Sequence, residues 1–351
     1  MNVDERYMDR CLELALNGLG HVAPNPLVGA VVVCDDKIIG EGFHQQFGQA
    51  HAEVNAINNA KKFIEENKDA YALERSVLYV NLEPCSHHGK TPPCVDLIIQ
   101  HKISKVVIGT IDPFAKVNGE GVMKLETAGI KVVQGIREEA CKELNKRFFT
   151  FHLKKRPYII IKYAQSKDGF IAAEERNTGS PYISNEYSLK VFHKWRSEEQ
   201  AIMVGTNTAV TDNPSLTVRH WKGKNPIRVV TDRALKLDKN LSIFNQEAPT
   251  LVFNEIKNES SGHVDYIKID FSKDAPQQMM NELYKKNIQS IIIEGGTKLL
   301  QSFIDKGLWD EARIFTGNKW LGDGVKAPVL EGKIISKETI LDDELIVLKR
   351  I

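Results

Sequence analysis

The spacing of apolar residues in the first 146 positions alternates between the period of a helix and the unbroken run of a buried strand. Met8, Cys11, Leu12, Ala15 and Leu16 recur at helical spacing, which predicts an amphipathic helix near the start. The whole region reads as helix, strand, strand, helix, strand, helix, strand, strand, helix, which predicts an α/β sheet covered on both faces. Strands are expected at residues 30–33, 38–40, 76–82 and 105–109.

The second part of the chain shows the same alternation. An apolar strand begins at Tyr158, and helical patterns fall at residues 185–195, 275–285 and 298–306. This part is therefore also predicted to be α/β. Its further strands are expected at residues 201–204, 228–231, 250–253 and 291–294.

The length of 351 residues is more than one ordinary core accommodates, so two domains are expected. Residues 148–157 contain the charge run Lys154-Lys155-Arg156 followed by a proline, and we interpret them as a solvated linker. The boundary is therefore placed at Arg147, which gives domains at residues 1–146 and 147–351.

Composition narrows the class of partner. The chain has 47 basic and 46 acidic residues, so it offers no basic field for nucleic acid, and small molecules are the expected partners. No apolar run is long enough to cross a bilayer, and residues 1–6 lack the apolar core of a signal peptide. Five cysteines do not form a disulfide framework, which favours a cytoplasmic chain with free thiols at Cys11, Cys34 and Cys141.

One histidine, one glutamate and two cysteines form the most informative pattern in the chain: His51 and Glu53, then Cys85 and Cys94. Imidazole and thiolate groups suit zinc, and three protein ligands leave the fourth tetrahedral position for a water of lowered pKa. Glu53, which need not bind the metal, would carry the proton of that water to a departing amine. The order His-x-Glu, Pro-Cys, Cys is the pattern of the zinc deaminases, with three metal ligands and Glu53 as the catalytic residue.

Each part of this pattern has a plainer explanation when it is taken alone. His51 could be a surface or capping residue, and two cysteines nine positions apart could be small buried hydrophobes. The local context favours the metal site. The strand at residues 76–82 ends just before Cys85, and Cys94 opens an apolar helix, whose N-terminus favours a thiolate.

The spacing of the two cysteines points to one branch of these deaminases. Eight residues separate Cys85 from Cys94, where deaminases of nucleic acid usually have two. The loop CSHHGKTPPC resembles the deaminase half of the bifunctional pyrimidine deaminase/reductase family of riboflavin biosynthesis, with Lys90 where arginine is more usual. Residues 23–30 (APNPLVGA), 42–44 (GFH), 48–53 (GQAHAE), 112–113 and 117–121 resemble the same family. The resemblance implies a cytidine-deaminase-like three-layer domain in which Asn25 and His44 contact the substrate.

The second domain has neither the Gly-x-Gly-x-x-Gly nor the Walker A motif. The apolar strand that ends in Glu294-Gly295-Gly296 could present backbone N–H groups to a cofactor pyrophosphate, but such a turn is often only a tight connection. Residues 162–169 and 204–219, together with this turn, resemble the reductase half of the same family, although Lys167 replaces the usual leucine.

That resemblance implies a dihydrofolate-reductase-like fold that uses NADPH. Tyr182 stands where tryptophan is expected and keeps an aromatic face, and Arg196 and Arg219 are plausible phosphate clamps, although a single arginine is more often a surface ion-pair partner. Arg233 is our candidate for the NADPH 2′-phosphate. The implied NADPH contacts are Ala164, Tyr182, Thr208, Asp212 and Gly296, and the implied substrate contacts are Ser180, Arg196, Leu216, Arg219 and Glu294.

We therefore predict a two-step enzyme of riboflavin synthesis. Zinc-dependent deamination of 2,5-diamino-6-ribosylamino-4(3H)-pyrimidinone 5′-phosphate would be followed by NADPH-dependent reduction of the ribosyl to the ribityl side chain. A homo-oligomer is expected, with no nucleic-acid or membrane partner. Three alternatives remain open: a nucleic-acid base deaminase, a zinc-stabilised binding module, and a single-activity zinc nucleobase deaminase with a non-catalytic reductase-like domain.

Overall fold

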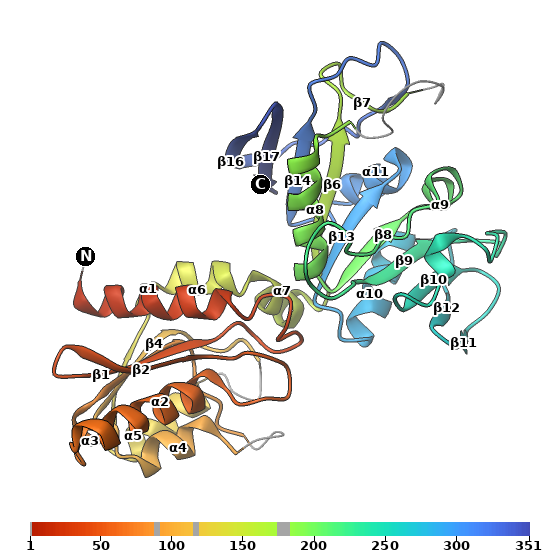
Figure 1. Ribbon diagram of the computed structural model, residues 1–351. Coiled ribbons are helices and arrows are strands. Elements are labelled where there is room, and N and C mark those ends of the chain that lie inside the picture. Colours follow the sequence, from red (N-terminus) through yellow and green to blue (C-terminus); the bar gives the residue numbers. More distant parts are fainter. Residues whose placement is uncertain (1, 88–91, 115–118, 174–182) are drawn as a thin grey trace. The chain divides into compact units, whose positions relative to one another are not determined.

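The computed structural model describes residues 2–87, 92–114, 119–173 and 183–351. The chain divides into two compact units, Met1–Lys154 and Lys155–Ile351. Each unit is built from helices that pack on a largely buried sheet, as Figure 1 shows, so the predicted α/β class is confirmed in both.

The first unit contains a five-stranded sheet in the order β2–β1–β3–β4–β5. Strand β1 is antiparallel to both of its neighbours, whereas β3, β4 and β5 are parallel to one another. The three central strands are almost entirely buried, which is why the sequence shows them as unbroken apolar runs. The strands are β1 (Gly29–Cys34), β2 (Lys37–Phe43), β3 (Val77–Leu82), β4 (Lys105–Thr110) and β5 (Lys131–Gln134).

Alternate residues of these strands enter two separate cores, one on each face of the sheet. Val32 and Leu78 point into the core beneath α2, α4 and α5, whereas Val31 and Tyr79 point into the core beneath α1 and α6. The result is the predicted arrangement of three layers, which is visible in Figure 1. The helices are α1 (Val3–Leu16), α2 (Ala52–Asn67), α3 (Ala72–Arg75), α4 (Cys94–Gln100), α5 (Glu120–Thr127), α6 (Glu138–Leu144) and α7 (Lys146–Lys154).

Helix α5 is absent from the predicted order, which ran directly from one strand to the next at this point. Strands β4 and β5 are parallel, and a parallel pair needs a crossover rather than a hairpin. Helix α5 provides that crossover, and Val122 and Leu125 bury its apolar side. The short helix α3 was also missed.

The predicted solvated linker is wrong over most of its length. Residues 146–154 form helix α7, in which Phe148 and Phe151 are buried three residues apart on one side. The linker was predicted from the charge run at the end of this helix. The helix forms because it buries the two phenylalanines. The chain divides after Lys154 rather than after residue 146.

The second unit is organised around a ten-stranded sheet in the order β11–β12–β10–β9–β8–β13–β6–β14–β17–β16. The seven strands from β12 to β14 in this order run parallel, and β11, β17 and β16 are antiparallel additions at the two ends. The central strands are β6 (Tyr158–Gln165), β8 (Ala201–Val204), β9 (Ile227–Thr231), β10 (Thr250–Asn254), β13 (Ser290–Gly295) and β14 (Glu311–Thr316). The outer ones are β11 (Glu259–Ser261), β12 (Val264–Lys268), β16 (Lys333–Ile340) and β17 (Asp343–Lys349), and β7 (Phe170–Ala172) pairs separately with β15 (Val325–Lys326).

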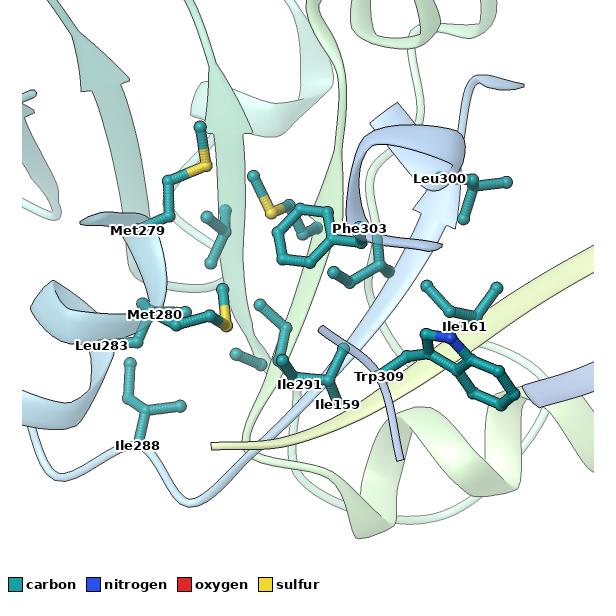
Figure 2. Close-up of a cluster of buried hydrophobic side chains, with 14 of the residues drawn as sticks. Ile159, Ile161, Met279, Met280, Leu283, Ile288, Ile291, Leu300, Phe303 and Trp309 are labelled. Carbon is teal, nitrogen blue, oxygen red and sulfur yellow. The ribbon is translucent and has the colours of Figure 1, made fainter. Parts of the chain in front are cut away.

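Two helices cover one face of this sheet and two others cover the opposite face. Figure 2 shows Met279, Met280 and Leu283 packed with Phe303 against the strand residues Ile159 and Ile291. The other face receives Ile160 and Ile292 together with Phe192. The covering helices are α10 (Ala275–Lys285) and α11 (Thr297–Asp305) on the first face, and α8 (Glu186–Glu198) and α9 (Thr206–Asp212) on the second.

All five strands predicted in the second part are present, but β7, β11, β12, β14, β15, β16 and β17 were missed. Strand β14 contains two charges in its interior, Glu311 and Arg313, which are buried and joined by an Nε–Oε1 distance of 2.6 Å. Strand β16 is mostly exposed and therefore shows no apolar run. Periodicity alone cannot detect strands of either kind.

We predict that Gly40→Ala destabilises the first unit. A Cβ at this position on β2 would lie 2.3 Å from the Ala56 oxygen and 2.5 Å from the Ala60 nitrogen, so the helix α2 would be pushed off the sheet. Overpacking of this kind costs about 1–3 kcal/mol in the free energy of unfolding, which chemical denaturation measures.

The matched control is Lys37→Ala at the exposed start of the same strand. Its free energy of unfolding should stay within about 0.5 kcal/mol of the wild-type value. An equal loss in the two variants would contradict the close packing of α2 on β2.

Candidate active sites

Three separate segments of the first unit bring the predicted metal ligands together. His51 is the N-cap residue of α2, Cys85 follows β3, and Cys94 is the first residue of α4. The ligand atoms of all three lie within 4.8 Å of one another. The His51 Nδ1 atom is 3.3 Å from the Cys94 sulfur and 3.5 Å from the Cys85 sulfur.

These distances fit a zinc ion. Bonds of about 2.0 Å to nitrogen and about 2.3 Å to sulfur at tetrahedral angles place the nitrogen about 3.5 Å from each sulfur. The donor set is also the one that zinc prefers, because imidazole and thiolate are both good ligands for this borderline-soft cation. His51, Cys85 and Cys94 would hold the ion through one nitrogen and two sulfur atoms.

The two thiols interact with each other, and this interaction shifts the pKa of each in opposite directions. The thiol of Cys94, with a further contribution from His51, lowers the pKa of Cys85 to about 4, and the backbone N–H of Cys94 donates to the Cys85 sulfur at 3.3 Å. The same interaction with Cys85 raises the pKa of Cys94. The lowered pKa favours the thiolate form of Cys85, and a cation between the two sulfur atoms would favour the thiolate form of both.

Glu53 lies two residues after His51, in the first turn of α2, and its side chain is 3% exposed. Burial raises the pKa of this carboxyl to about 7, and the negative charge at Cys85 acts in the same direction. A carboxyl with such a pKa exchanges its proton readily near neutral pH. Its position beside the ligand group, without belonging to it, suits a proton carrier.

Glu83 is a residue of this region that the sequence did not single out. Its buried carboxylate accepts hydrogen bonds from the backbone N–H groups of Asp112, Gly119 and Gly121, at 3.2, 3.0 and 2.9 Å. Glu83, two residues before Cys85, thereby holds Asp112 after β4 and the start of α5. The available signal was a charged residue at the end of an otherwise apolar strand.

Asn25 and His44 lie beside the ligand group. The Asn25 amide is 3.0 Å from His44 Nε2, and His44 Nδ1 is 3.0 Å from the Ala50 carbonyl oxygen. Burial lowers the pKa of His44, and the two contacts fit a ring that donates from Nδ1 to the carbonyl oxygen and accepts at Nε2 from the Asn25 amide. The ring centroid of His44 is 5.4 Å from that of His51. The structure therefore brings both predicted substrate residues to the candidate metal centre.

In the second unit, a largely buried ionic cluster forms in the carboxyl-terminal halves of two parallel strands. Lys162 follows Ile160 on β6 by two residues, Glu294 follows Ile292 on β13 in the same way, and Ile160 and Ile292 are register partners. Lys162 Nζ is 3.3 Å from Glu294 Oε1. From α8, Arg196 donates to Glu294 Oε2 at 3.2 Å. Carboxyl ends of parallel strands are where open α/β sheets bind ligands.

Lys162 is the second residue of importance that the sequence did not single out, although it lies in a motif quoted for the family resemblance. Its ammonium group is 3.4 Å from the ring centroid of Phe192, and burial lowers its pKa. The available signal was a lysine that interrupts the apolar strand of residues 158–163. Because it contacts Glu294, it belongs to the same group as two of the predicted substrate contacts.

The predicted cofactor residues adjoin this cluster through the turns that follow β8 and β13. Thr208 Oγ1 accepts a hydrogen bond of 2.9 Å from the backbone N–H of Gly296, the N-cap residue of α11. A Cβ at Gly296 would come within 3.2 Å of the same oxygen, so this close approach favours glycine. Asp212 is the exposed last residue of α9, and Ala164 is half-buried on β6.

The loop after α9 contains the remaining predicted substrate residues that the structure describes. Leu216 is buried and has a φ of 55°, a left-handed conformation that is unusual for leucine and points to constraint by its surroundings. Arg219 donates through its side chain to Ser215 and through its backbone N–H to His193 Nδ1, at 3.0 Å in the second case. Ser180, Tyr182 and Lys90, and residues 117–118 of the deaminase motif, lie outside the described residues.

Two family descriptions match this chain. The description "Cytidine and deoxycytidylate deaminase zinc-binding region" matches residues 1–110, and "RibD C-terminal domain" matches residues 157–344. The second covers more than half of the chain by itself. The two matches together place a zinc-dependent deaminase before a reductase-type domain.

Curated relatives and solved structures match both domains at once. The riboflavin biosynthesis protein RibD of Aquifex aeolicus is 39% identical over 92% of this chain and 89% of that protein, and the RibD protein of Synechocystis is 40% identical over 94% and 88%. The chain belongs to the RibD family. The structure of a Thermotoga maritima deaminase/reductase aligns with a TM-score of 0.89 and 39% identity over 99% of both chains. That of Acinetobacter baumannii RibD aligns with a TM-score of 0.88 and 30% identity over 99% of both chains.

The family membership confirms the predicted class of both domains and their activities. This member of the RibD family is a bifunctional enzyme of riboflavin biosynthesis, with a deaminase that has a zinc-binding His51, Cys85 and Cys94 group and a dihydrofolate-reductase-like reductase that implies a nicotinamide cofactor. Among the residues that the structure describes, no helix is long and apolar enough to cross a membrane.

We predict that Cys85→Ser lowers the zinc content of the purified protein well below one equivalent. A serine hydroxyl is a far weaker zinc ligand than a thiolate, and the remaining two ligands do not hold the ion tightly. Elemental analysis of dialysed protein measures the effect.

The control is Cys34→Ser, which changes a buried thiol of β1 outside the ligand group. That variant should keep its full equivalent of zinc. A Cys85→Ser protein with an unchanged zinc content would remove Cys85 from the ligand set.

Proposed function

We propose that this enzyme deaminates 2,5-diamino-6-ribosylamino-4(3H)-pyrimidinone 5′-phosphate and then reduces the ribosyl side chain of the product to ribityl with NADPH. The observation that carries the proposal is the group of His51, Cys85 and Cys94 beside the buried carboxyl of Glu53, in a chain that also contains the Lys162–Glu294–Arg196 cluster. The Thermotoga maritima relative is described as a diaminohydroxyphosphoribosylaminopyrimidine deaminase and 5-amino-6-(5-phosphoribosylamino)uracil reductase, which supports the same pair of substrates here.

In the deaminase domain, zinc would supply a bound water of lowered pKa and the Lewis acidity that favours attack on the ring carbon. Glu53 accepts the proton of the water and returns it to the departing amine, so that water is consumed and ammonia is released. Asn25 and His44 line the same place and orient the substrate, with the neutral His44 ring held by the Ala50 carbonyl oxygen.

In the reductase domain, the nicotinamide would supply a hydride to C1′ of the ribosyl group. The bond between C1′ and the ring oxygen breaks, and that oxygen needs one proton. Lys162 is the donor that the geometry favours, because its ammonium group is buried, has a lowered pKa and is oriented by Glu294 at 3.3 Å. Arg196 holds Glu294 from the other side.

Further assignments belong to this proposal. NADPH contacts are assigned to Ala164, Tyr182, Thr208, Asp212 and Gly296, and substrate contacts to Ser180, Arg196, Leu216, Arg219 and Glu294. A cytoplasmic location is supported by the free state of all five cysteines. We retain the homo-oligomer as an expectation. A nucleic-acid substrate is disfavoured by the net charge of +1.

We predict reciprocal losses in two variants. Glu53→Gln should keep its zinc but lose deamination by about a hundredfold to ten-thousandfold, the usual contribution of a positioned proton carrier, and should still reduce the deaminated pyrimidine. Lys162→Met should deaminate at the wild-type rate and lose the reduction step. Mass spectrometry of the products, with each pyrimidine supplied separately, measures both activities.

The two variants serve as controls for each other, since the altered residues belong to different compact units. Deamination at a near wild-type rate in Glu53→Gln would refute the role of Glu53. A loss of both activities in either variant would contradict the division of chemistry between the two domains.

We predict a preference for NADPH over NADH of at least about tenfold in kcat/KM, the size expected for one hydrogen bond to a charged phosphate. Arg233 lies two residues after the end of β9 and pairs with Glu255, at an Nε–Oε2 distance of 2.7 Å. Arg233→Ala should reduce kcat/KM for NADPH and leave that for NADH unchanged.

Steady-state kinetics with both cofactors decides the question. Equal efficiency with NADH and NADPH in the wild-type enzyme would overturn the cofactor assignment. An equal effect of Arg233→Ala on the two cofactors would assign the 2′-phosphate to another residue.

A further inference from the structure

His193, on helix α8 of the reductase domain, has a fixed hydrogen-bonding state. Its side chain is almost completely buried, and its Nδ1 atom accepts the backbone N–H of Arg219 at 3.0 Å. A ring nitrogen that accepts a hydrogen bond has no proton of its own. The proton of the neutral ring is therefore on Nε2, which is a donor.

That donor has no partner among the described residues. The Nε2 atom of His193 is buried without a hydrogen bond, and the same holds for the Nε atom of Arg196, one helical turn further along α8. Buried polar atoms in folded proteins are nearly always satisfied, so two neighbouring unsatisfied donors indicate a ligand that brings acceptor oxygens. Neither donor is needed to hold the loop, because His193 Nδ1 and Arg196 Nη1 already bind the Arg219 N–H and the Thr217 carbonyl oxygen.

The charges around His193 indicate the kind of acceptor. Burial is the largest cause that lowers the pKa of His193, and the nearby positive charges of Arg196, Arg219 and Lys162 act in the same direction. Together they bring this pKa to about 3. The imidazole therefore stays neutral at physiological pH. Glu294 is the carboxylate that contacts both Arg196 and Lys162, and the exposed Arg219 adds a third cation near His193. This excess of positive charge favours an anion, such as a phosphate monoester, as the ligand.

We propose that His193 is a further substrate-binding residue of the reductase, in which Nε2–H donates a hydrogen bond to the phosphate group of the ribose phosphate. The proposal rests on the proposed function for the identity of the substrate. His193 adds a neutral donor of fixed direction to the arginine side chains, and its Nδ1 holds the segment from Leu216 to Arg219 so that Arg219 reaches the same group.

Two substitutions separate the donor from the support of the loop. In His193→Asn, the side-chain oxygen can still accept from the Arg219 N–H, but no donor reaches the position of Nε2. In His193→Gln, the amide nitrogen can reach that position. Ribose 5-phosphate is the probe, and its affinity for the full-length protein at pH 7 is measured by calorimetry.

We expect His193→Asn to weaken the binding of ribose 5-phosphate about tenfold to a hundredfold, because a hydrogen bond to a charged acceptor is lost, and His193→Gln to recover most of that loss. Unphosphorylated ribose, tested in parallel, should bind all three proteins equally weakly.

In kinetics, His193→Asn should raise the KM for the deaminated pyrimidine and leave kcat within about threefold, as expected when uniform binding is lost. The matched control is His220→Asn, which changes the exposed histidine whose ring lies 4.8 Å from that of His193.

Equal affinity of the wild type and His193→Asn for ribose 5-phosphate would overturn the proposal. An equal loss of affinity in the Asn and Gln variants would also overturn it, because His193 would then only support the loop. A measurement on the wild type is independent of folding of the variants: with 15N-histidine labelling, the Nε2–H signal of His193 should shift on addition of ribose 5-phosphate but not of ribose. Absence of that shift also overturns the proposal. Since these binding tests need no turnover, a wild type that binds ribose 5-phosphate through His193 but reduces no pyrimidine would refute the proposed function alone.

Discussion

Both active sites depend on the requirement that parallel strands be joined by crossovers. A crossover returns the chain to the starting end of the next strand, so the parallel strands all finish, and the helices after them begin, at the same end of the sheet. In the first unit, β3 leads to Cys85, and Cys94 and His51 stand at the starts of α4 and α2. In the second, Lys162 lies in the second half of β6, Glu294 is the penultimate residue of β13, and α11 begins directly after the glycine turn. The chemistry of each domain follows from this common end of the sheet.

Some buried charged groups of the described residues are satisfied by local hydrogen bonds, which distinguishes them from the groups that we assign to ligands. Arg228 is fully buried, and its guanidinium donates to Thr250 and Asn245 side chains and to surrounding carbonyl oxygens. Glu83 is satisfied by backbone N–H groups in the same manner. Such groups fix loops and need no ligand. The thiols of Cys85 and Cys94 form a group that can hold a cation, and the donors of His193 Nε2 and Arg196 Nε have no partner among the described residues. We assign a cation to the first group and an anion to the second.

The sequence predicts best what depends on local pattern. Unbroken apolar runs revealed the central strands of both sheets, and the spacing of His51, Cys85 and Cys94 revealed the metal ligands, because each ligand lies next to a regular element. It predicts poorly what depends on pairing across the fold. Strand β14 escaped detection because its charged Arg313 finds Glu199, which is distant in sequence, only in the folded state. Helix α7 was taken for a linker because its charge run outweighed two phenylalanines. Lys162 and His193 were not recognised because their partners, Glu294 and Arg219, are distant in sequence. Lys162 pairs with Glu294, and His193 accepts a hydrogen bond from the Arg219 N–H.

The same physical cause produces opposite chemistry in Glu53 and His193. Burial disfavours the charged form of any group, so it raises the pKa of the Glu53 carboxyl to about 7 and contributes most to lowering that of the His193 imidazole to about 3. A carboxyl that titrates near neutrality can exchange a proton in every turnover, as deamination requires. An imidazole that remains neutral cannot, and it serves instead as a donor of constant direction. In our proposals, desolvation thus suits Glu53 to carry protons in one domain and His193 to bind an anion in the other.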